Sequence, residues 1–581
     1  MEKQMEKWVV SAKRADFKAI ASKFGIDPVT ARLIRNRDVT GDDAIEEYLH
    51  GDRRSLHDPH LLKDADRLAA ILSDKIQKQK KVRIIGDYDI DGVNASYILL
   101  KGLRRCGGDV DVEIPDRMKD GYGINEHLIR FAWEEGIDTI LTCDNGIAAV
   151  EQTAMARQLG MTVLITDHHE PQEILPDADA LVNPRQVDCP YPYKNLCGAA
   201  VAFKVIQCLY QRMKVPANEA MDFLEFAAFA TIGDVMDLTG ENRIIVREGL
   251  RMLNHTKNFG MAALIRECGL ENNEIKAYHV GFVLGPCINA GGRLDTAKRS
   301  LALLLADDVQ EASHMARELK MLNDERKDMT QKGTEEAIAK IEQQGLLKDK
   351  VLVVYLPDCH ESLAGIIAGR IRERYNRPVF VLTDSGDGVK GSGRSIEAYS
   401  MFEEMSKCKE LYTKYGGHPM AAGLSLPKKN VPVFRRRLNE LTHLKEEDFI
   451  PKIVIDVPMP VGYITERLIS ELNILEPFGK GNVKPLFAEK DLDIQNIRIL
   501  GKNRNTLKMQ VKSQDGTVLD ALYFGDVKQF IDYLKQRFGE EETEKCFQNR
   551  LNAVYLSLIY YPSVNEYRDR RTIQIVISHY C

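Results

Sequence analysis

The sequence predicts an α/β protein with a parallel-sheet domain, a long connecting helix, a second α/β domain and a small C-terminal β-barrel. Three observations lead to this fold class. Between residues 81 and 305, apolar runs that end in acidic or polar residues alternate with helical stretches, as in βαβ units. The segment 309–345 is charged and only sparsely apolar, which is typical of one long helix. From about residue 451, short alternating strands indicate a barrel.

Length and composition limit the class of protein. With 581 residues the chain is too long for one hydrophobic core. Its 44% hydrophobic and 29% charged residues are typical of globular proteins. No apolar run is long enough to cross a bilayer, and the charged N-terminus lacks the apolar core of a signal peptide. The 11 cysteines are scattered without a Cys-x-x-Cys pair, so we expect a cytoplasmic protein without a disulfide framework.

These patterns divide the chain into consecutive segments. We expect an N-terminal helical segment, the parallel-sheet domain, the connecting helix, the second α/β domain and the barrel. Their boundaries are 1–75, 76–308, 309–348, 349–448 and 449–581. The strands expected in the parallel sheet are Val82–Ile85, Thr139–Cys143, Thr162–Thr166 and Ala180–Val182.

Three acids follow the first of these strands. Asp87, Asp89 and Asp91 alternate within the stretch Gly86–Gly92, just before a helical segment. Carboxylates this close repel one another and are costly to bury unpaired, and a divalent cation removes both problems. A single Asp-x-Asp at a strand end is more often a helix cap or a turn.

Further acids and histidines share this layout. Asp144 and Asp167-His168-His169 each follow an apolar run, and Asp234 follows an apolar helix. Because the carboxyl ends of parallel strands converge on one edge of a sheet, we expect these side chains to meet in one crevice. Mixed carboxylate and imidazole ligands suit manganese or a similar borderline ion. If Asp144 bridges, the ligands suffice for two ions, which can activate water and stabilise both oxygens in a displacement at phosphorus.

Motifs in both α/β domains resemble the signatures of the DHH phosphoesterase family. Asp-His-His alone would be a weak signal, but the combination in this order is highly specific and runs from about residue 50 to the end. It narrows the resemblance to the single-strand-specific exonucleases of the family. The matching stretches are 86–92, 143–146, 167–169, 182–184, 196–200, 233–235, 285–293, 391–395, 416–423 and 475–479.

The resemblance implies a 5′-to-3′ exonuclease that hydrolyses single-stranded DNA to mononucleotides in DNA repair and recombination. The implied cofactor is Mn²⁺ or Mg²⁺, with two ions in one site. Single-stranded DNA is the expected partner of a monomeric protein, with a helicase or a single-strand-binding protein as a further partner. Since the net charge is −6, the polyanion must be held by local basic patches or by the metals.

The resemblance also assigns metal ligands, position by position. One ion would be held by Asp89 and Asp144. The other would be held by Asp91, Asp144, His168 and Asp234.

Two residues of these motifs are expected to support catalysis, and Arg394 is expected to offset the charge that builds on the phosphoryl oxygens. The resemblance gives Asp87 and His169 the tasks of orienting ligands and moving protons. Some family members carry a histidine two residues before the first acid, where this chain has Ile85. One ligand of the first ion is therefore expected to be missing.

The second α/β domain resembles the DHH-associated domain, which holds nucleic-acid phosphates in this family. Ser392 and Arg394 lie in a glycine-rich strand, where backbone can approach a phosphate and arginine can bind it bidentately. His418 follows two glycines and is expected to face the same crevice, while Arg117 is the candidate for a terminal 5′-phosphate. The alternative for each is a surface turn residue.

The tail resembles an OB-fold, which binds single strands through basic grooves and aromatic stacking. The alternative is that the same residues are solvated charges and core aromatics. The candidate basic residues are Lys502, Arg504, Arg568, Arg570 and Arg571, and the candidate stacking residues are Phe524, Tyr560 and Tyr561.

Two other functions stay open. A DHH phosphodiesterase could act on short oligonucleotides or cyclic dinucleotides, although such substrates need no long β-rich tail. A catalytically silent replication scaffold is disfavoured, because such relatives lose the acids and every motif acid is present here.

Overall fold

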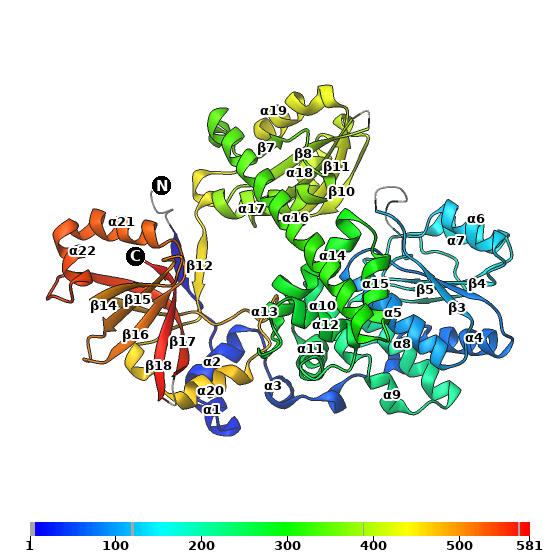
Figure 1. The fold of residues 1–581 in the computed structure, drawn as a ribbon, viewed down its shortest axis with the longest axis horizontal. Coiled ribbons are helices and arrows are strands. Elements are labelled where there is room, and N and C mark those ends of the chain that lie inside the picture. Colours follow the sequence, from blue (N-terminus) through cyan, green and yellow to red (C-terminus); the bar gives the residue numbers. More distant parts are fainter. Residues whose placement is uncertain (1–5, 118–120, 122, 387, 568–569) are drawn as a thin grey trace. The chain divides into compact units, whose positions relative to one another are not determined.

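Figure 1 shows a computed structural model of the chain, which describes residues 6–117, 121, 123–386, 388–567 and 570–581. The chain divides into two compact units. One consists of residues up to 50 together with 446–476 and 483–581, and the other consists of 51–445 and 477–482. Within the described ranges, no helix is both long and apolar enough to cross a membrane.

The second unit contains the predicted parallel sheet, with strand order β3-β2-β4-β5-β6. The four predicted strands form as expected. The edge strand β3 was not predicted, because only one of its four residues is buried and its apolar signal is weak. The strands are β2 Val82–Ile85, β3 Val110–Glu113, β4 Thr139–Cys143, β5 Thr162–Thr166 and β6 Ala180–Val182.

Helices cover both faces of this sheet, as Figure 1 shows. One face packs with α4, α5 and α8 around Ile84, Leu141 and Leu164. The other packs with α6 and α7 around Ile85 and Ile165. The helices are α4 Ala65–Gln77, α5 Ile90–Arg105, α6 Glu126–Glu134, α7 Val150–Gln158 and α8 Gly198–Met213.

A helical layer follows the sheet and ends in the predicted connecting helix, α16 Val309–Gln343. Ala312 and Leu319 of α16 belong to the core of the first domain, whereas Ala337 and Ile341 belong to the core of the second. The helices before α16 are α9 Ala217–Met221, α10 Leu224–Gly233, α11 Gly240–Leu253, α12 Phe259–Glu267, α13 Ala277–His279, α14 Gly285–Leu294 and α15 Lys298–Leu305.

The second α/β domain has a mixed sheet of order β10-β11-β9-β8-β7. Gly393 of this sheet has a packing reason: a Cβ there would lie 2.7 Å from the Phe380 ring and 2.5 Å from the Met401 sulfur. The elements are β7 Leu352–Tyr355, α17 Ala364–Tyr375, β8 Val379–Ser385, β9 Gly388–Arg394, α18 Met401–Ser406, β10 Lys414–His418, β11 Ala421–Leu426 and α19 Val431–Leu441.

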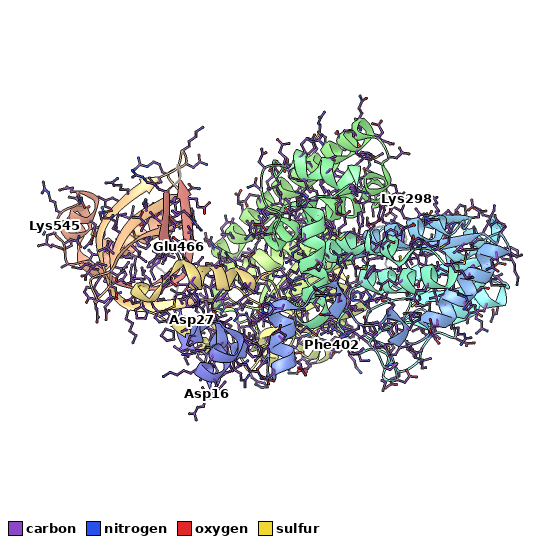
Figure 2. The ribbon with its side chains drawn as sticks, turned by 90° about the horizontal axis from the view of Figure 1, so that it is seen from below. Asp16, Asp27, Lys298, Phe402, Glu466 and Lys545 are labelled. Carbon is purple, nitrogen blue, oxygen red and sulfur yellow. The ribbon has the colours of Figure 1, made fainter. Side chains whose placement is uncertain are left out.

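The first unit combines the N-terminal residues with the barrel. The segment expected to be helical begins with a strand, β1 Lys7–Val10, which pairs in parallel with β12 Lys452–Ile455. Asp16 and Asp27 then cap α1 Phe17–Phe24 and α2 Pro28–Asn36 (Figure 2). The pairing of β1 with β12 joins residues far apart in sequence, so local propensity does not reveal it.

Pairing of β14 with β17 closes a five-stranded barrel. Around the barrel, the five strands pair in the order β14-β15-β16-β18-β17. The other elements of this unit are α3 Asp42–His50, β13 Val457–Pro458, α20 Glu466–Ile474, β14 Phe487–Leu500, β15 Thr506–Lys512, β16 Val518–Tyr523, α21 Val527–Phe538, α22 Glu540–Phe547, β17 Tyr555–Tyr567 and β18 Arg570–Tyr580.

The barrel aromatics correct one expectation. Tyr560 is fully buried and its hydroxyl donates to the carbonyl of Met459 at 2.5 Å, and Tyr561 is also buried. The prediction that these rings stack on bases is therefore wrong, because both side chains are enclosed by the protein. Phe524 is 61% exposed. Lys502, Arg504, Arg570 and Arg571 are exposed, whereas Arg568 lies outside the described residues.

Candidate metal centre and phosphate groove

The three acids after β2 are held by different partners. Asp89 caps α5, with its Oδ1 accepting from the backbone N–H groups of Asp91 at 2.9 Å and Gly92 at 3.1 Å. Asp91 is buried and accepts from the first N–H groups of α8, Gly198 at 2.6 Å and Ala199 at 2.7 Å. Helix starts favour such anionic acceptors, so Asp91 ties α5 to α8. Asp87 is also buried.

His168 lies among the remaining acids. Its Nε2 is 3.1 Å from Asp144 Oδ1, 3.5 Å from Asp91 Oδ2 and 3.9 Å from Asp234 Oδ2. Asp144 follows β4 with a φ of 61°, in the left-handed region that aspartate tolerates better than most residues. Asp234 is the residue that ends α10. The edge of the sheet therefore collects acids from strands and a core helix around one imidazole.

His169 is positioned by Asp167. The Asp167 carboxylate accepts from His169 Nδ1 at 2.8 Å and from the backbone N–H groups of Ile147 at 2.8 Å and His168 at 2.7 Å. His169 Nδ1 also lies 4.0 Å from Asp144 Oδ1. Asp167 thus fixes the loop after β5 and the orientation of the His169 ring.

Burial and mutual repulsion of these carboxylates perturb their pKa values. Burial, then the charge of Asp89, raises the pKa of Asp87 well above its usual value. Burial, then the charge of Asp91, raises the pKa of Asp144 well above its usual value and that of Asp234 to about 8. Burial lowers the pKa of His168, which favours the neutral imidazole that a metal requires.

The donor atoms fit divalent cations. Three overlapping groups, Asp87 with Asp89 and Asp144, Asp144 with His168 and His169, and Asp91 with His168 and Asp234, each offer ligand atoms within 4.8 Å of one another. Among the described residues, Asp87 Oδ1 is buried without a hydrogen-bond partner, as expected of an oxygen meant for an ion. Oxygen-rich sites with one imidazole suit Mn²⁺ and Mg²⁺.

These shifts predict how the stability of the metal-free protein depends on pH. Although burial opposes it, the hydrogen bond to Asp167 raises the pKa of His169 from 6.5 to about 9. Asp234, raised from 3.8 to about 8, shifts in the same direction. The folded state then binds more protons than the unfolded state, so the free energy of unfolding falls as pH rises from 6.5 to 9.

Thermal melts in a chelator across this pH range measure the effect. The decline of the melting temperature with rising pH should become smaller when Mn²⁺ replaces the protons. It should also become smaller in metal-free Asp234→Asn. A metal-free melting temperature that rises with pH over the same range would contradict the assignment.

A groove of about 430 Å³ lies between the two α/β domains of the second unit. Two of the candidate phosphate-binding residues, Arg117 and Ser392, line it. Arg394 does not line it but donates to Ser392 Oγ at 3.0 Å, immediately behind it. His418 is exposed at the end of β10 and is not among the lining residues. Further lining residues that sequence reasoning missed are Lys390, Lys414, Tyr415 and Ser425.

Arg293 is a further candidate site residue that the sequence did not single out. It lies on α14, at the end of the quoted stretch 285–293, and donates to the carbonyl of Ser362 at 2.8 Å. Burial, followed by the charges of Arg117 and Arg326, lowers its pKa to about 10, and Asp89 opposes this shift. Because other arginines lie near the Arg293 guanidinium, a bound anion would be favourable there. The sequence signal for it was an arginine after two glycines.

Family models match three segments of the chain: the DHH family N-terminal domain over 81–231, the DHHA1 domain over 348–443 and the RecJ OB domain over 455–579. The chain is 36% identical over 565 residues to the single-stranded-DNA-specific exonuclease RecJ of Bacillus subtilis, covering 97% of this chain and 69% of that protein. It is 31% identical to the RecJ of Escherichia coli, covering 95% and 96%. The chain belongs to the RecJ family.

Solved structures agree with this membership. The crystal structure of RecJ in complex with Mn²⁺ from Thermus thermophilus matches with a TM-score of 0.81 at 26% identity, covering 99% of this chain and 79% of that one. The Mg²⁺ complex of RecJ from the same organism matches with a TM-score of 0.76 at 25% identity, covering 99% and 78%. The predictions of the fold class and of an enzyme of the DHH phosphoesterase family are confirmed, and the barrel is the RecJ OB domain.

Proposed function

We propose that this RecJ-family protein is a 5′-to-3′ exonuclease that degrades single-stranded DNA to mononucleotides with two ions of Mn²⁺ or Mg²⁺. One observation carries the proposal: a cluster of largely buried acids with His168 and His169 lies in the same compact unit as a groove lined by Arg117, Lys390 and Lys414, and the charge of Arg117 acts on Asp87 of the cluster. The names of its relatives as single-stranded-DNA-specific exonucleases and the metals bound to RecJ of T. thermophilus support it. The groove contacts suit phosphates, which predicts low base specificity.

We assign Asp87, Asp89 and Asp144 to one ion. Asp87 joins the ligands here, instead of supporting them, because one of its carboxylate oxygens belongs to the same group of ligand atoms and its Oδ1 is buried without a hydrogen-bond partner in the described structure. It offers the oxygen that the first ion would otherwise lack, since Ile85 is packed in the apolar core. When bound, the ions polarise the phosphodiester and lower the pKa of water.

We assign the second ion to Asp91, Asp144, His168 and Asp234. Asp144 is shared because its oxygens lie within reach of both groups. Asp91 has a second task, since it also holds the start of α8. A change at Asp91 should therefore reduce both activity and stability.

The protein's own groups complete the reaction. His169 keeps its proton at neutral pH because Asp167 accepts from it, so it can donate a proton to the leaving oxygen. Arg293 and Arg394 offset the charge on the phosphate. Arg117 and Ser392 hold the 5′ end together with Arg394, which donates to Ser392. His418, exposed at the end of β10, remains a candidate for a further phosphate contact outside the groove. We expect a cytoplasmic monomer that works with a helicase or a single-strand-binding protein.

Asp87→Asn tests the first metal group. Bound manganese should fall from two equivalents to one, and turnover should fall by about 100-fold or more, because the second ion alone cannot stabilise both the attacking and the leaving oxygen. Dialysis against Mn²⁺ followed by metal analysis measures the first quantity. Asp179→Asn, outside the metal groups, is the control. If Asp87→Asn still binds two equivalents of Mn²⁺, Asp87 is not a metal ligand and only orients the ligands.

The function itself is tested with end-labelled single strands of both polarities, duplexes, dinucleotides and cyclic dinucleotides, each with and without Mn²⁺. We expect mononucleotides from the 5′ ends of single strands. Faster hydrolysis of dinucleotides or cyclic dinucleotides than of long strands would favour the small-substrate alternative. Intact strands with both the wild type and Asp144→Asn would favour the silent scaffold.

A further inference from the structure

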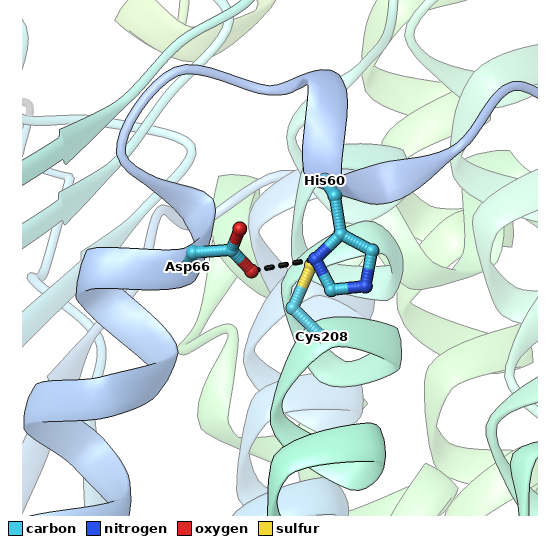
Figure 3. Close-up of side chains that lie close together, drawn as sticks. All are labelled: His60, Asp66 and Cys208. Carbon is cyan, nitrogen blue, oxygen red and sulfur yellow. Dashed lines mark hydrogen bonds and ion pairs between the residues drawn. The ribbon is translucent and has the colours of Figure 1, made fainter.

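A second group of metal-ligating side chains lies outside the catalytic cluster. His60, in the short 3₁₀ turn Pro59–Leu61, meets Asp66 on α4 and Cys208 on α8, as Figure 3 shows. One ligand atom from each lies within 4.8 Å of the others. The same three residues line a cavity of about 290 Å³. His60 and Asp66, which are close in sequence, thus meet the distant Cys208, and the three present nitrogen, oxygen and sulfur to one space.

The hydrogen bonds of His60 indicate what that space holds. Its Nε2 is 2.6 Å from the side-chain oxygen of Gln211, so Nε2–H donates there. Its Nδ1 is 2.5 Å from Asp66 Oδ1. If Nε2 carries the proton, Nδ1 presents a lone pair to a carboxylate oxygen, and two acceptors this close repel each other. Either a second proton or a cation must lie beside them.

This is the usual arrangement of a metal-bound histidine. Such a histidine donates its second ring N–H to a protein acceptor, which fixes the ring and aims the other nitrogen at the ion. A second proton on His60 would satisfy Asp66 equally well. Only an ion would also bind the sulfur of Cys208, so a test at Cys208 distinguishes the two explanations.

We propose that His60, Asp66 and Cys208 form a binding site for a thiophilic divalent ion of the Zn²⁺ class. Imidazole, carboxylate and thiolate together suit zinc, whereas Mn²⁺ and Mg²⁺ prefer the oxygen-rich catalytic group. His60 and Asp66 are exposed while Cys208 is buried, so an ion enters from solvent and keeps a position for water. On binding, the Cys208 thiol loses its proton to solvent and the sulfur ligates the ion.

An ion bound at this site would link three elements of the fold. It joins the 3₁₀ turn and α4 to α8, whose first N–H groups hold Asp91 of the catalytic cluster. An ion that binds only the folded chain raises the free energy of unfolding. We therefore expect the ion to stabilise the unit that carries the catalytic cluster without taking part in hydrolysis.

Cobalt(II) is the probe for the test. The chelator-treated full chain is saturated with Mg²⁺ to fill the catalytic group and is then titrated with Co²⁺. A single equivalent should produce the near-ultraviolet thiolate-to-cobalt charge-transfer band, and Zn²⁺ should displace it. The catalytic groups contain no cysteine, so cobalt bound there gives no such band. Cys208→Ser should abolish the band, whereas Cys106→Ser, a half-buried thiol outside the cluster, should keep it.

Stability gives a second readout. Zn²⁺ should raise the melting temperature of the wild type by several degrees and leave His60→Ala unchanged. Because the His60 side chain is exposed, this variant should fold even if Cys208→Ser does not. Exonuclease activity with Mn²⁺ should be retained in His60→Ala. Absence of the band, its survival in Cys208→Ser, or equal zinc stabilisation of the wild type and His60→Ala would overturn the proposal.

Discussion

Asp144→Asn is expected to lower exonuclease turnover by about 10³-fold or more and, at the same time, to raise the thermal stability of the metal-free protein. Turnover falls because Asp144 is the carboxylate shared by both proposed ions. Stability rises because burial and the charge of Asp91 hold the pKa of Asp144 well above its usual value. At neutral pH its ionisation therefore costs folding free energy, and asparagine removes that charge.

The control for this variant separates charge from backbone conformation. Asp144 has a φ of 61°, and asparagine is favourable in that region, so backbone preference alone could stabilise the variant. Asp64, with a φ of 63°, lies outside the metal groups. Asp64→Asn should change neither turnover nor the response of the melting temperature to a chelator. A metal-free Asp144→Asn less stable than the wild type would contradict the electrostatic account.

Arg394→Ala is expected to lower kcat/KM on 5′-phosphorylated single strands by about 100-fold, which corresponds to about 3 kcal/mol for the charged hydrogen bonds lost. Arg394 is held by Ser392 Oγ at 3.0 Å and the carbonyl of Gly393 at 2.7 Å, so its guanidinium is oriented before substrate arrives. Burial, then the charge of Arg372, lowers its pKa, which a bound phosphate would reverse.

The result that identifies the role of Arg394 is the loss of the preference for a 5′-phosphate over a 5′-hydroxyl. The wild type should prefer a 5′-phosphate over a 5′-hydroxyl, and Arg394→Ala should treat the two ends alike. Arg436→Ala, which removes a surface arginine paired with Glu440 on α19, should behave as the wild type. If Arg394→Ala loses the same factor on both ends, the residue acts on internal phosphates and not on the terminal one.

Much of the metal centre could be predicted because its residues follow strands. The apolar runs define the strands of a parallel sheet, and topology brings the acids after β2, β4 and β5 to one edge. The tasks of the individual acids were less predictable. Asp87, Asp89 and Asp91 are equivalent by spacing, and their contacts distinguish them: Asp89 accepts from the start of α5 and Asp91 from the start of α8.

The sequence by itself determined the alternation of strands and helices, the long helix α16, the barrel and the set of acids and histidines, since local periodicity and motif order carry that information. Only the tertiary structure decided which charges face one another. The cationic crowding at Arg293, the buried Tyr560 in the barrel and the meeting of His60 with Cys208 all depend on contacts between distant segments. Burial and electrostatic interaction are properties of neighbours in space, and the order of residues along the chain does not specify them.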